Sequence, residues 1–271
     1  MHSTARPCFP RFMPFSTTAP VPCIRLRGLR TEFPIPGRRG ETTRVLHDID
    51  LEIPEGRLTA VVGPSGSGKS TLLLCTAGLE RATAGSVEIL GTDVRSLSPR
   101  KQAAFRSENI GFVFQEYNLV SSLTVEDNIA LPARLAGRRV PRARVEDAMA
   151  RLGIAKHARR RPDRLSGGER QRVAVARVVA NQPRIVFADE PTGALDLKSG
   201  HVVLDWLQAL PAQGSTVLMV THDPHAAARA DQVVVMGSGR VHAVIPGGDS
   251  RAVGDAVLAA QSADEAGGEE S

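Results

Sequence analysis

The alternation of apolar and polar residues first predicts a strand with one buried face. From His47 to Ile53 the two classes alternate, with Ile49, Leu51 and Ile53 on one side and acidic residues on the other. This pattern is typical of a half-buried strand, most often an antiparallel one. A turn at residues 54–57 then separates this strand from a run of a different kind.

Three runs that are apolar almost throughout predict strands covered on both faces, at 58–62, 184–188 and 215–220. Because helical patterns separate these runs, they indicate a parallel sheet with crossover helices. Two shorter runs, 233–235 and 241–244, flank the segment MGSGR and predict a hairpin. The chain therefore has the pattern of an α/β domain.

The remaining stretches predict one inserted subdomain and two terminal extensions. Between 116 and 182 the pattern is polar and helical, so we expect a helical subdomain inserted into the α/β core. Residues 1–22 are rich in proline and lack a sustained apolar segment, which predicts a disordered leader. Small residues and a closing acidic cluster predict a flexible acidic tail at 246–271. The folded part is expected to span 24–245.

Length and cysteine content agree with a single intracellular domain. A chain of 271 residues can form one large α/β domain, or two modest ones, with a hydrophobic core. Its three cysteines show no paired spacing, so we expect a reducing, cytoplasmic location without disulfides. No apolar run approaches the ~18 to 20 residues that span a bilayer, so the chain is not expected to cross a membrane by itself.

The net charge of +5 would permit nucleic-acid binding, but its distribution does not point to that partner. Nearly all of the positive charge is arginine, and lysine occurs at only Lys69, Lys101, Lys156 and Lys198. The densest basic stretch, 138–164, fits a solvated helical surface or a surface that contacts lipid headgroups or a partner protein. Charge alone does not decide between these interpretations of the basic stretch. We expect no nucleic-acid partner.

The segment GPSGSGKST fits the phosphate-binding loop pattern G-x-x-x-x-G-K-[ST] and lies between a buried strand and a helical run. Glycines there let backbone N–H groups turn toward phosphates at a positively polarised helix start. Lys69 would reach the β and γ phosphates, and Ser70 would ligate Mg²⁺. The predicted nucleotide contacts are Gly63, Pro64, Ser65, Gly66, Ser67, Gly68, Lys69, Ser70 and Thr71.

Two carboxylates follow the buried run at 184–188. Since this run ends at the predicted carboxyl edge of the sheet, Asp189 can hold Mg²⁺ through water, and Glu190 can lie near an attacking water. Carboxylates at a strand end can also simply be solvated in a loop. The chain has no N-K-x-D run to read guanine, which argues against a GTPase.

The segment LSGGERQ allows two interpretations. Ser166 and Glu169 form the pattern S-x-x-E ahead of a helical run, which predicts a capping box. Capping does not require Gly167 and Gly168, however. The two glycines leave the N–H groups of the helix start uncovered, so an anion could approach as it does in a phosphate-binding loop. Both interpretations hold in part, and anion binding explains more of the residues.

In their order along the chain, these motifs resemble those of the ATP-binding cassette family over about 24–245. The matching motifs are the Walker A loop (63–71), Gln115 of the Q-loop, the signature (165–171), Walker B (184–190), the D-loop (193–196) and the switch residue His222. The resemblance implies a P-loop NTPase (RecA-like) core with a mostly parallel sheet, an antiparallel β subdomain and the inserted helical subdomain.

The resemblance also implies roles that the residues alone do not fix. Gln115 would contact Mg²⁺ or the attacking water, although it could be an ordinary amide at a strand end. His222 would contact the γ-phosphate of ATP. Phe33 is similar to the family's adenine-stacking aromatic residue, although it could merely pack in a loop. Asp196 belongs to the D-loop. The implied catalytic residues are Glu190, His222, Gln115 and Lys69, and the implied Mg²⁺ ligands are Ser70, Gln115 and Asp189.

One chain carries one phosphate-binding loop and one signature. A head-to-tail homodimer would let each signature cap the γ-phosphate held by the other chain, and the resemblance implies this arrangement. We therefore expect the chain to dimerise on ATP. The signature residues that would reach the partner's ATP are Ser166, Gly167, Gly168 and Glu169.

The amino-acid sequences of these motifs are similar to those of the family branch that handles lipoprotein release, macrolide efflux and antimicrobial-peptide resistance. That resemblance implies an ATP-hydrolysing subunit on the inner face of the cell membrane, which drives a separate transmembrane permease and exports a peptide, lipoprotein or drug-like substrate. Apolar positions near the Q-loop, Tyr117, Leu119, Val120 and Leu123, would dock the permease or form helical core. Alternatives are a mechanotransmitting ATPase that activates a wall hydrolase without transport, and a soluble DNA-repair-type ATPase.

Overall fold

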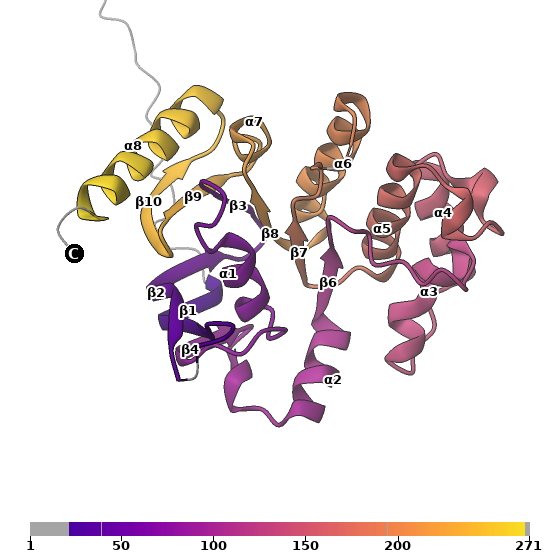
Figure 1. Ribbon diagram of the computed structural model, residues 1–271. Helices are drawn as coiled ribbons and strands as arrows, with labels where there is room; N and C mark the ends of the chain where they lie inside the picture. The colour runs from indigo at the N-terminus through magenta and orange to yellow at the C-terminus, as the bar shows by residue number, and fades with distance from the viewer. Residues whose placement is uncertain (1–21, 39, 194, 269–271) are drawn as a thin grey trace, which may run out of the picture.

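The computed structural model describes residues 22–38, 40–193 and 195–268. It contains two sheets flanked by helices, as Figure 1 shows. A four-stranded antiparallel sheet has the order β2-β1-β4-β5, and a six-stranded, mostly parallel sheet has the order β10-β9-β3-β8-β7-β6. This arrangement confirms the predicted fold class. The predicted leader at 1–22 lies outside the described residues except for Pro22, which begins β1.

The strands are β1 (Pro22–Pro34), β2 (Thr42–Pro54), β3 (Leu58–Val62), β4 (Ala84–Ile89), β5 (Thr92–Asp93), β6 (Ile110–Val113), β7 (Ile185–Asp189), β8 (Thr216–Thr221), β9 (Gln232–Gly237) and β10 (Arg240–Pro246). The α-helices are α1 (Lys69–Thr76), α2 (Pro99–Asn109), α3 (Val125–Leu135), α4 (Arg142–Arg151), α5 (Gly167–Asn181), α6 (Leu197–Ala209), α7 (Pro224–Ala227) and α8 (Ser250–Gly268). Short 3₁₀ turns are η1 (Val94–Ser96), η2 (Ala155–His157), η3 (Pro162–Arg164) and η4 (Pro211–Gln213).

The half-buried strand predicted at 47–53 is the second half of β2, which pairs antiparallel with β1. Its apolar face is buried and packs in one cluster with β1 and α1. Strand β1 itself does not show a regular alternation along the sequence. Its register shifts near Gly28, whose φ of +53° breaks the extended conformation, so the period-2 pattern is interrupted.

The fully apolar runs form the centre of the six-stranded sheet. Strand β3 coincides with the predicted run, and β7 and β8 begin one residue later than predicted. Strands β3, β8, β7 and β6 are parallel to one another, and β9 with β10 forms the predicted hairpin. Because parallel strands end at the same edge, the segments that follow β3, β7 and β8 are brought together there.

Helices α3, α4 and α5 fill the stretch between 116 and 182, all of which the structure describes, and no strand interrupts it. In Figure 1 they lie together at one end of the molecule, far from α8. Apolar residues such as Ile129, Met149 and Val173 pack in the same cluster as the central strands. That this region is a separate subdomain stays a prediction.

The predicted flexible tail is wrong for residues 250–268, which form the helix α8. Val253 and Ala260 are buried, and Ala256 and Val257 are partly buried against the main core. These residues recur at helical spacing, so they form one apolar stripe along α8. Asp264 lies on the same side, 3.1 Å from Nε2 of His242 on β10. Small residues therefore indicate close helix packing here rather than flexibility.

Replacing Val253 by aspartate is expected to lower the free energy of unfolding by about 2 kcal/mol, because it buries a charge without a partner. Denaturant unfolding measures the change. The control is Leu258→Asp on the same helix, since Leu258 is 61% exposed. Equal effects of the two substitutions would contradict the docking of α8 on the sheet.

Among the helices of the described ranges, none combines the length and the apolar character needed to span a bilayer.

Candidate functional site

The glycines of the phosphate-binding loop adopt conformations that other residues would strain or block. A Cβ atom at Gly63 would collide with the carbonyl oxygen of Met236. Gly66 and Gly68 have φ values of +81° and +89°, and Gly68 caps α1 without a side-chain hydrogen bond. The N–H groups at this helix start are therefore not covered by a capping side chain.

Strands from both sheets hold the loop in place. The N–H of Gly239, in the turn between β9 and β10, donates to the carbonyl oxygen of Ser67 at 3.2 Å. The N–H of His47 on β2 donates in turn to the carbonyl oxygen of Gly239 at 2.9 Å. The loop is thus anchored to the hairpin and through it to the antiparallel sheet, which makes it a preformed cradle.

Lys69 is the cation of this cradle. Its Nζ donates to the carbonyl oxygens of Gly63 at 2.9 Å and Pro64 at 2.7 Å, and the residue is buried. Burial lowers the pKa of the Lys69 ammonium, whereas the charges of Glu190 and Asp189 act in the opposite direction. The ammonium group therefore lies where a bound phosphate would compensate its desolvation.

Ser70 and Asp189 form a pair of oxygen ligands beside the loop. The Ser70 hydroxyl donates to Oδ1 of Asp189 at 2.9 Å. Burial raises the pKa of Asp189, while the hydrogen bond from Ser70 lowers it. A hydroxyl and a carboxylate suit Mg²⁺, which often takes few protein ligands and completes its shell with phosphate and water oxygens. The described residues contain no cluster of three or more His, Cys, Asp or Glu side chains that would suit another metal.

Glu190 and His222 meet at the carboxyl edge of the sheet. Nδ1 of His222 lies 2.8 Å from Oε1 of Glu190, and the hydroxyl of Thr221 is 3.4 Å from Oε2. Glu190 has a φ of +44°, which is uncommon for a residue with a side chain. The backbone bond from its N–H to Val220 at 2.9 Å stabilises this conformation. The structure thus brings together two residues that lie 32 positions apart.

Gln115 and the D-loop lie next to this pair. The Nε2 atom of Gln115 is 3.5 Å from the place where a Cβ of Gly193 would stand, and the Cβ of Glu190 is 3.6 Å from it. Asp196 caps α6 by accepting from the N–H of Ser199 at 3.0 Å. This hydrogen bond is the main cause of its lowered pKa. Residue 194 of the D-loop lies outside the described residues.

The signature begins α5 with the predicted capping box. The N–H of Glu169 donates to the hydroxyl of Ser166 at 3.3 Å, and the N–H of Ser166 donates to Oε2 of Glu169 at 2.9 Å. Within the described residues, no hydrogen bond joins 165–171 to the phosphate-binding loop. Cβ atoms at Gly167 and Gly168 would instead meet Tyr117 and Ser199.

Phe33 is the predicted ATP-binding residue that lies outside the phosphate-binding loop. It lies near the end of β1, opposite Thr43 of β2, and is partly exposed. Its neighbour Glu32 is paired with Arg44 at 2.8 Å. No hydrogen bond of the described residues connects this strand end to the phosphate-binding loop, so adenine stacking by Phe33 stays a prediction.

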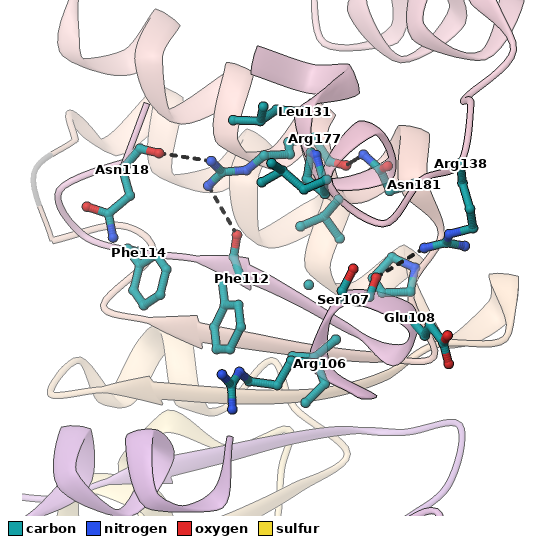
Figure 2. A pocket seen from close by; sticks show the side chains of 16 residues that line it. Arg106, Ser107, Glu108, Phe112, Phe114, Asn118, Leu131, Arg138, Arg177 and Asn181 are labelled. Carbon is teal, nitrogen blue, oxygen red and sulfur yellow. Dashed lines mark hydrogen bonds between the residues drawn. The ribbon is translucent and has the colours of Figure 1, made fainter. Parts of the chain in front are cut away.

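Sequence reasoning missed the residues that hold the Q-loop. Arg177 on α5 donates to the carbonyl oxygens of Asn118 at 2.9 Å and Tyr117 at 3.2 Å, and its bond to Asn118 is drawn in Figure 2. Burial lowers the pKa of Arg177. Asn128 on α3 is fully buried and binds both backbone groups of Val120, at 2.8 and 3.0 Å. Asn128 could have been found from the sequence, because it is a polar residue at a helical position where the pattern predicts burial.

A cavity of about 300 Å³ opens beside the Q-loop, between β6, α2, α3 and α5. Figure 2 shows Phe112 and Phe114 on one side of it and Leu131 on the other. Its charged residues are Arg106, Glu108, Arg138 and Arg177. Of the apolar Q-loop positions, Val120 is 40% exposed and Leu119 packs against the main core. The region thus contains both exposed surface and core.

A phosphate-binding loop on a parallel sheet, with Asp189 and Glu190 after a neighbouring strand, defines the chain as a P-loop nucleoside triphosphatase. A family model described as "ABC transporter" matches residues 46–193, which is more than half of the chain. The chain therefore belongs to the ABC transporter family and is an ABC-type ATPase. The predicted family resemblance is confirmed.

The similar curated proteins fall in the predicted branch. The chain is 47% identical, over 82% of its length, to "Macrolide export ATP-binding/permease protein MacB 1/2" of Paracoccus denitrificans, but covers only 33% of that protein. It is 40% identical, over 80% of its length, to "Uncharacterized ABC transporter ATP-binding protein YknY" of Bacillus subtilis and covers 94% of it. The chain thus spans about a third of the length of its MacB relatives.

Two solved structures share the fold. The ATP-binding cassette MJ0796, in a dimeric post-hydrolysis state bound to ADP and Pi, has a TM-score of 0.76 at 33% identity, covering 82% of this chain and 98% of that one. CbiO1 of Clostridium perfringens, part of the ABC transporter complex cbiONQ, has a TM-score of 0.71 at 27% identity, covering 83% of this chain and 88% of that one.

Proposed function

We propose that the chain binds ATP with Mg²⁺ and hydrolyses it as one half of a head-to-tail homodimer that drives a separate transmembrane permease. The observation that carries the homodimer is the position of the signature. Ser166 caps α5, the next two residues Gly167 and Gly168 lie beside Tyr117 and Ser199, and the hydrogen bonds of Ser166 do not reach the phosphate-binding loop of the same chain. A second copy supplies what one chain lacks, and the dimeric MJ0796 cassette supports this arrangement.

ATP binding uses the preformed loop. The N–H groups of 63–71 surround the phosphates at the start of α1, and Lys69 moves its Nζ from two carbonyl oxygens to phosphate oxygens. Phe33 offers a ring face to adenine. Mg²⁺, held by Ser70, Gln115 and Asp189, supplies positive charge that neutralises the phosphate oxygens.

Hydrolysis uses the pair at the sheet edge. Glu190 orients a water in line with the γ-phosphate and accepts a hydrogen bond from it, since its carboxylate is fixed by Thr221 and His222. Nδ1 of His222 faces the Glu190 carboxylate, so Nε2 donates to the γ-phosphate at the same time in the doubly protonated imidazolium form. The exposed position of His222 suits a residue that meets a phosphate on dimer closure.

The signature of the second copy completes the site. The capping box uses the Ser166 oxygen as an acceptor, so the hydroxyl proton remains available to a phosphate oxygen. Gly167 and Gly168 add backbone N–H groups without side chains in the way. Loss of the γ-phosphate removes this bridge and opens the dimer. Light scattering with and without ATP tests this step. A protein that stays monomeric at saturating ATP while hydrolysis is blocked would contradict it.

The permease is proposed to dock at the cavity beside the Q-loop, with the cassette on the cytoplasmic, inner face of the cell membrane. The proposed cargo is a peptide, lipoprotein or drug-like substrate. The MacB relatives are named macrolide export ATP-binding/permease proteins, which supports a permease partner and, of these substrates, the drug-like one. The cavity offers aromatic and aliphatic walls, and Arg177 connects it to the Q-loop through backbone hydrogen bonds. Through these hydrogen bonds, a permease docked at the cavity would affect the position of the loop that carries Gln115.

Leu135→Asp is expected to reduce co-purification with the proposed permease about tenfold, because it places a charge in an apolar contact. Leu135 lines the cavity and is 77% exposed, so the fold should tolerate the change. Basal ATP hydrolysis should be unchanged. The matched control is Leu258→Asp, on α8 at the other end of the molecule. Equal loss in both variants would contradict docking at the cavity.

A further inference from the structure

A buried histidine lies directly behind the signature. His157 ends η2, its side chain is 5% exposed, and its Nε2 lies 2.9 Å from Oε1 of Glu169. The pair is at ion-pair distance without the alignment of a hydrogen bond, and Nδ1 has no partner among the described residues. Neither the phosphate-binding loop nor the Glu190 pair involves this side chain.

Glu169 connects His157 to the start of α5. Its Oε2 accepts from the N–H of Ser166 at 2.9 Å, while its Oε1 faces His157. The N–H of Ser166 is the largest cause that lowers the pKa of Glu169, and His157 contributes in the same direction. The carboxylate therefore accepts a hydrogen bond at Oε2 and faces the imidazole of His157 with Oε1, and both contacts favour its charged form.

The charge of Glu169 is unfavourable for a residue that must meet a triphosphate. A phosphate approaching the Ser166 hydroxyl comes within one helical turn of this carboxylate, and like charges at short range repel each other. A carboxylate pulled toward the protein interior opposes the phosphate less than one that is free to swing outward. His157 lies on the interior side, since it is buried and Glu169 is partly exposed.

We propose that His157 is a positioning residue of the signature, which holds the Glu169 carboxylate against the Ser166 amide and away from the γ-phosphate bound by the partner subunit. The Ser166 hydroxyl is then free to donate to that phosphate. The inference rests on the proposed homodimer, because a second copy brings the γ-phosphate to Ser166.

The test is a titration with ATP in which light scattering measures dimer formation. All variants are made in a Glu190→Gln background, which does not turn ATP over. His157→Leu is expected to raise the ATP concentration for half-maximal dimerisation about tenfold, as removal of one member of a coupled pair does. Glu169→Gln serves as the second background, because its amide oxygen still accepts from Ser166 but carries no charge for His157 to hold. In the Glu169→Gln background, His157→Leu should have no further effect.

Two measurements separate positioning from a general structural role. The melting temperature and the binding of a fluorescent ATP analogue to the monomer should be unchanged in each variant. His157→Gln keeps an N–H donor and should lose only about threefold, a partial rescue relative to His157→Leu. If His157→Leu does not fold, His157→Gln is carried through the same two backgrounds instead.

An equal loss from the His157 substitution with and without the Glu169 charge would overturn the inference. No loss in either background would overturn it as well. If the Glu190→Gln protein itself stays monomeric at saturating ATP, the homodimer proposal fails first, and this outcome is distinct from the other two.

Discussion

The Glu190→Gln variant is expected to hydrolyse ATP about a thousandfold more slowly than the parent protein and to accumulate as an ATP-bound dimer. The carboxylate of Glu190 is the only acidic group that the structure places in hydrogen-bonding contact with His222 among the described residues. An amide of the same shape keeps the contacts to Thr221 and His222 but cannot accept a proton from water.

Slow turnover and dimer accumulation have the same cause. In the proposed homodimer the γ-phosphate bridges Lys69 of one copy and Ser166 of the other, so a protein that keeps the γ-phosphate keeps the bridge. Phosphate release measures hydrolysis, and light scattering measures the dimer. The control is Glu146→Gln, a carboxylate on α4 that pairs with Arg142 at the surface. Turnover within tenfold of the parent, or a variant that remains monomeric with ATP, would contradict the role of Glu190.

The sequence could predict those parts of the fold that local pattern decides. Strand β3 is predicted at its observed bounds because all five of its residues are buried, and four of them, all but Thr59, are apolar, as is typical of a strand covered on both faces. The phosphate-binding loop is equally predictable, since Gly66 and Gly68 adopt positive φ values that favour glycine, and the spacing of the motif supplies glycine at both positions. The order of motifs also places Asp189, Glu190 and His222 at one edge, because the strands before them are parallel.

Features that depend on contacts distant in sequence could not be predicted. Helix α8 has the composition of a tail, and only its packing on β9 and β10 shows that Val253 and Ala260 are core residues. The hydrogen bonds from Arg177 to the Q-loop join residues 59 and 60 positions apart, so no local pattern reveals them. A lone histidine such as His157 has no sequence signature either, because its importance comes from the burial that places it on Glu169.

The signature shows why one pattern can carry two meanings. Ser166 and Glu169 form a capping box in the structure, so that interpretation is right about the local geometry. The same geometry leaves the Ser166 proton free and exposes N–H groups at the glycines, so capping does not compete with phosphate binding. A helix start that is preorganised within its own chain loses less entropy when a second copy docks on it.

Lys69→Ala is expected to weaken ATP binding about a hundredfold, since it removes the one ammonium group in the phosphate cradle. The fold should survive, because the loop keeps its bonds to the β9–β10 turn and loses the hydrogen bonds from Nζ to Gly63, Pro64 and Ser67, at a cost of about 1 kcal/mol. Burial lowers the pKa of the Lys69 ammonium, because it disfavours the charged form. A bound phosphate would reverse that penalty, so the ammonium and the phosphate should stabilise each other.

The measurement is the rise in melting temperature that ATP produces, together with a titration by a fluorescent ATP analogue. A ligand that binds only the folded state stabilises it in proportion to the logarithm of its concentration over Kd, so a hundredfold loss of affinity lowers this stabilisation by about 2.7 kcal/mol at high ATP. Lys101→Ala, at an exposed position of α2, is the control and should melt with the same ATP-dependent rise as the parent. If Lys69→Ala retains that rise while its fold is intact, the cradle does not bind triphosphate through Lys69, and the phosphate site must be sought elsewhere on the carboxyl edge of the sheet.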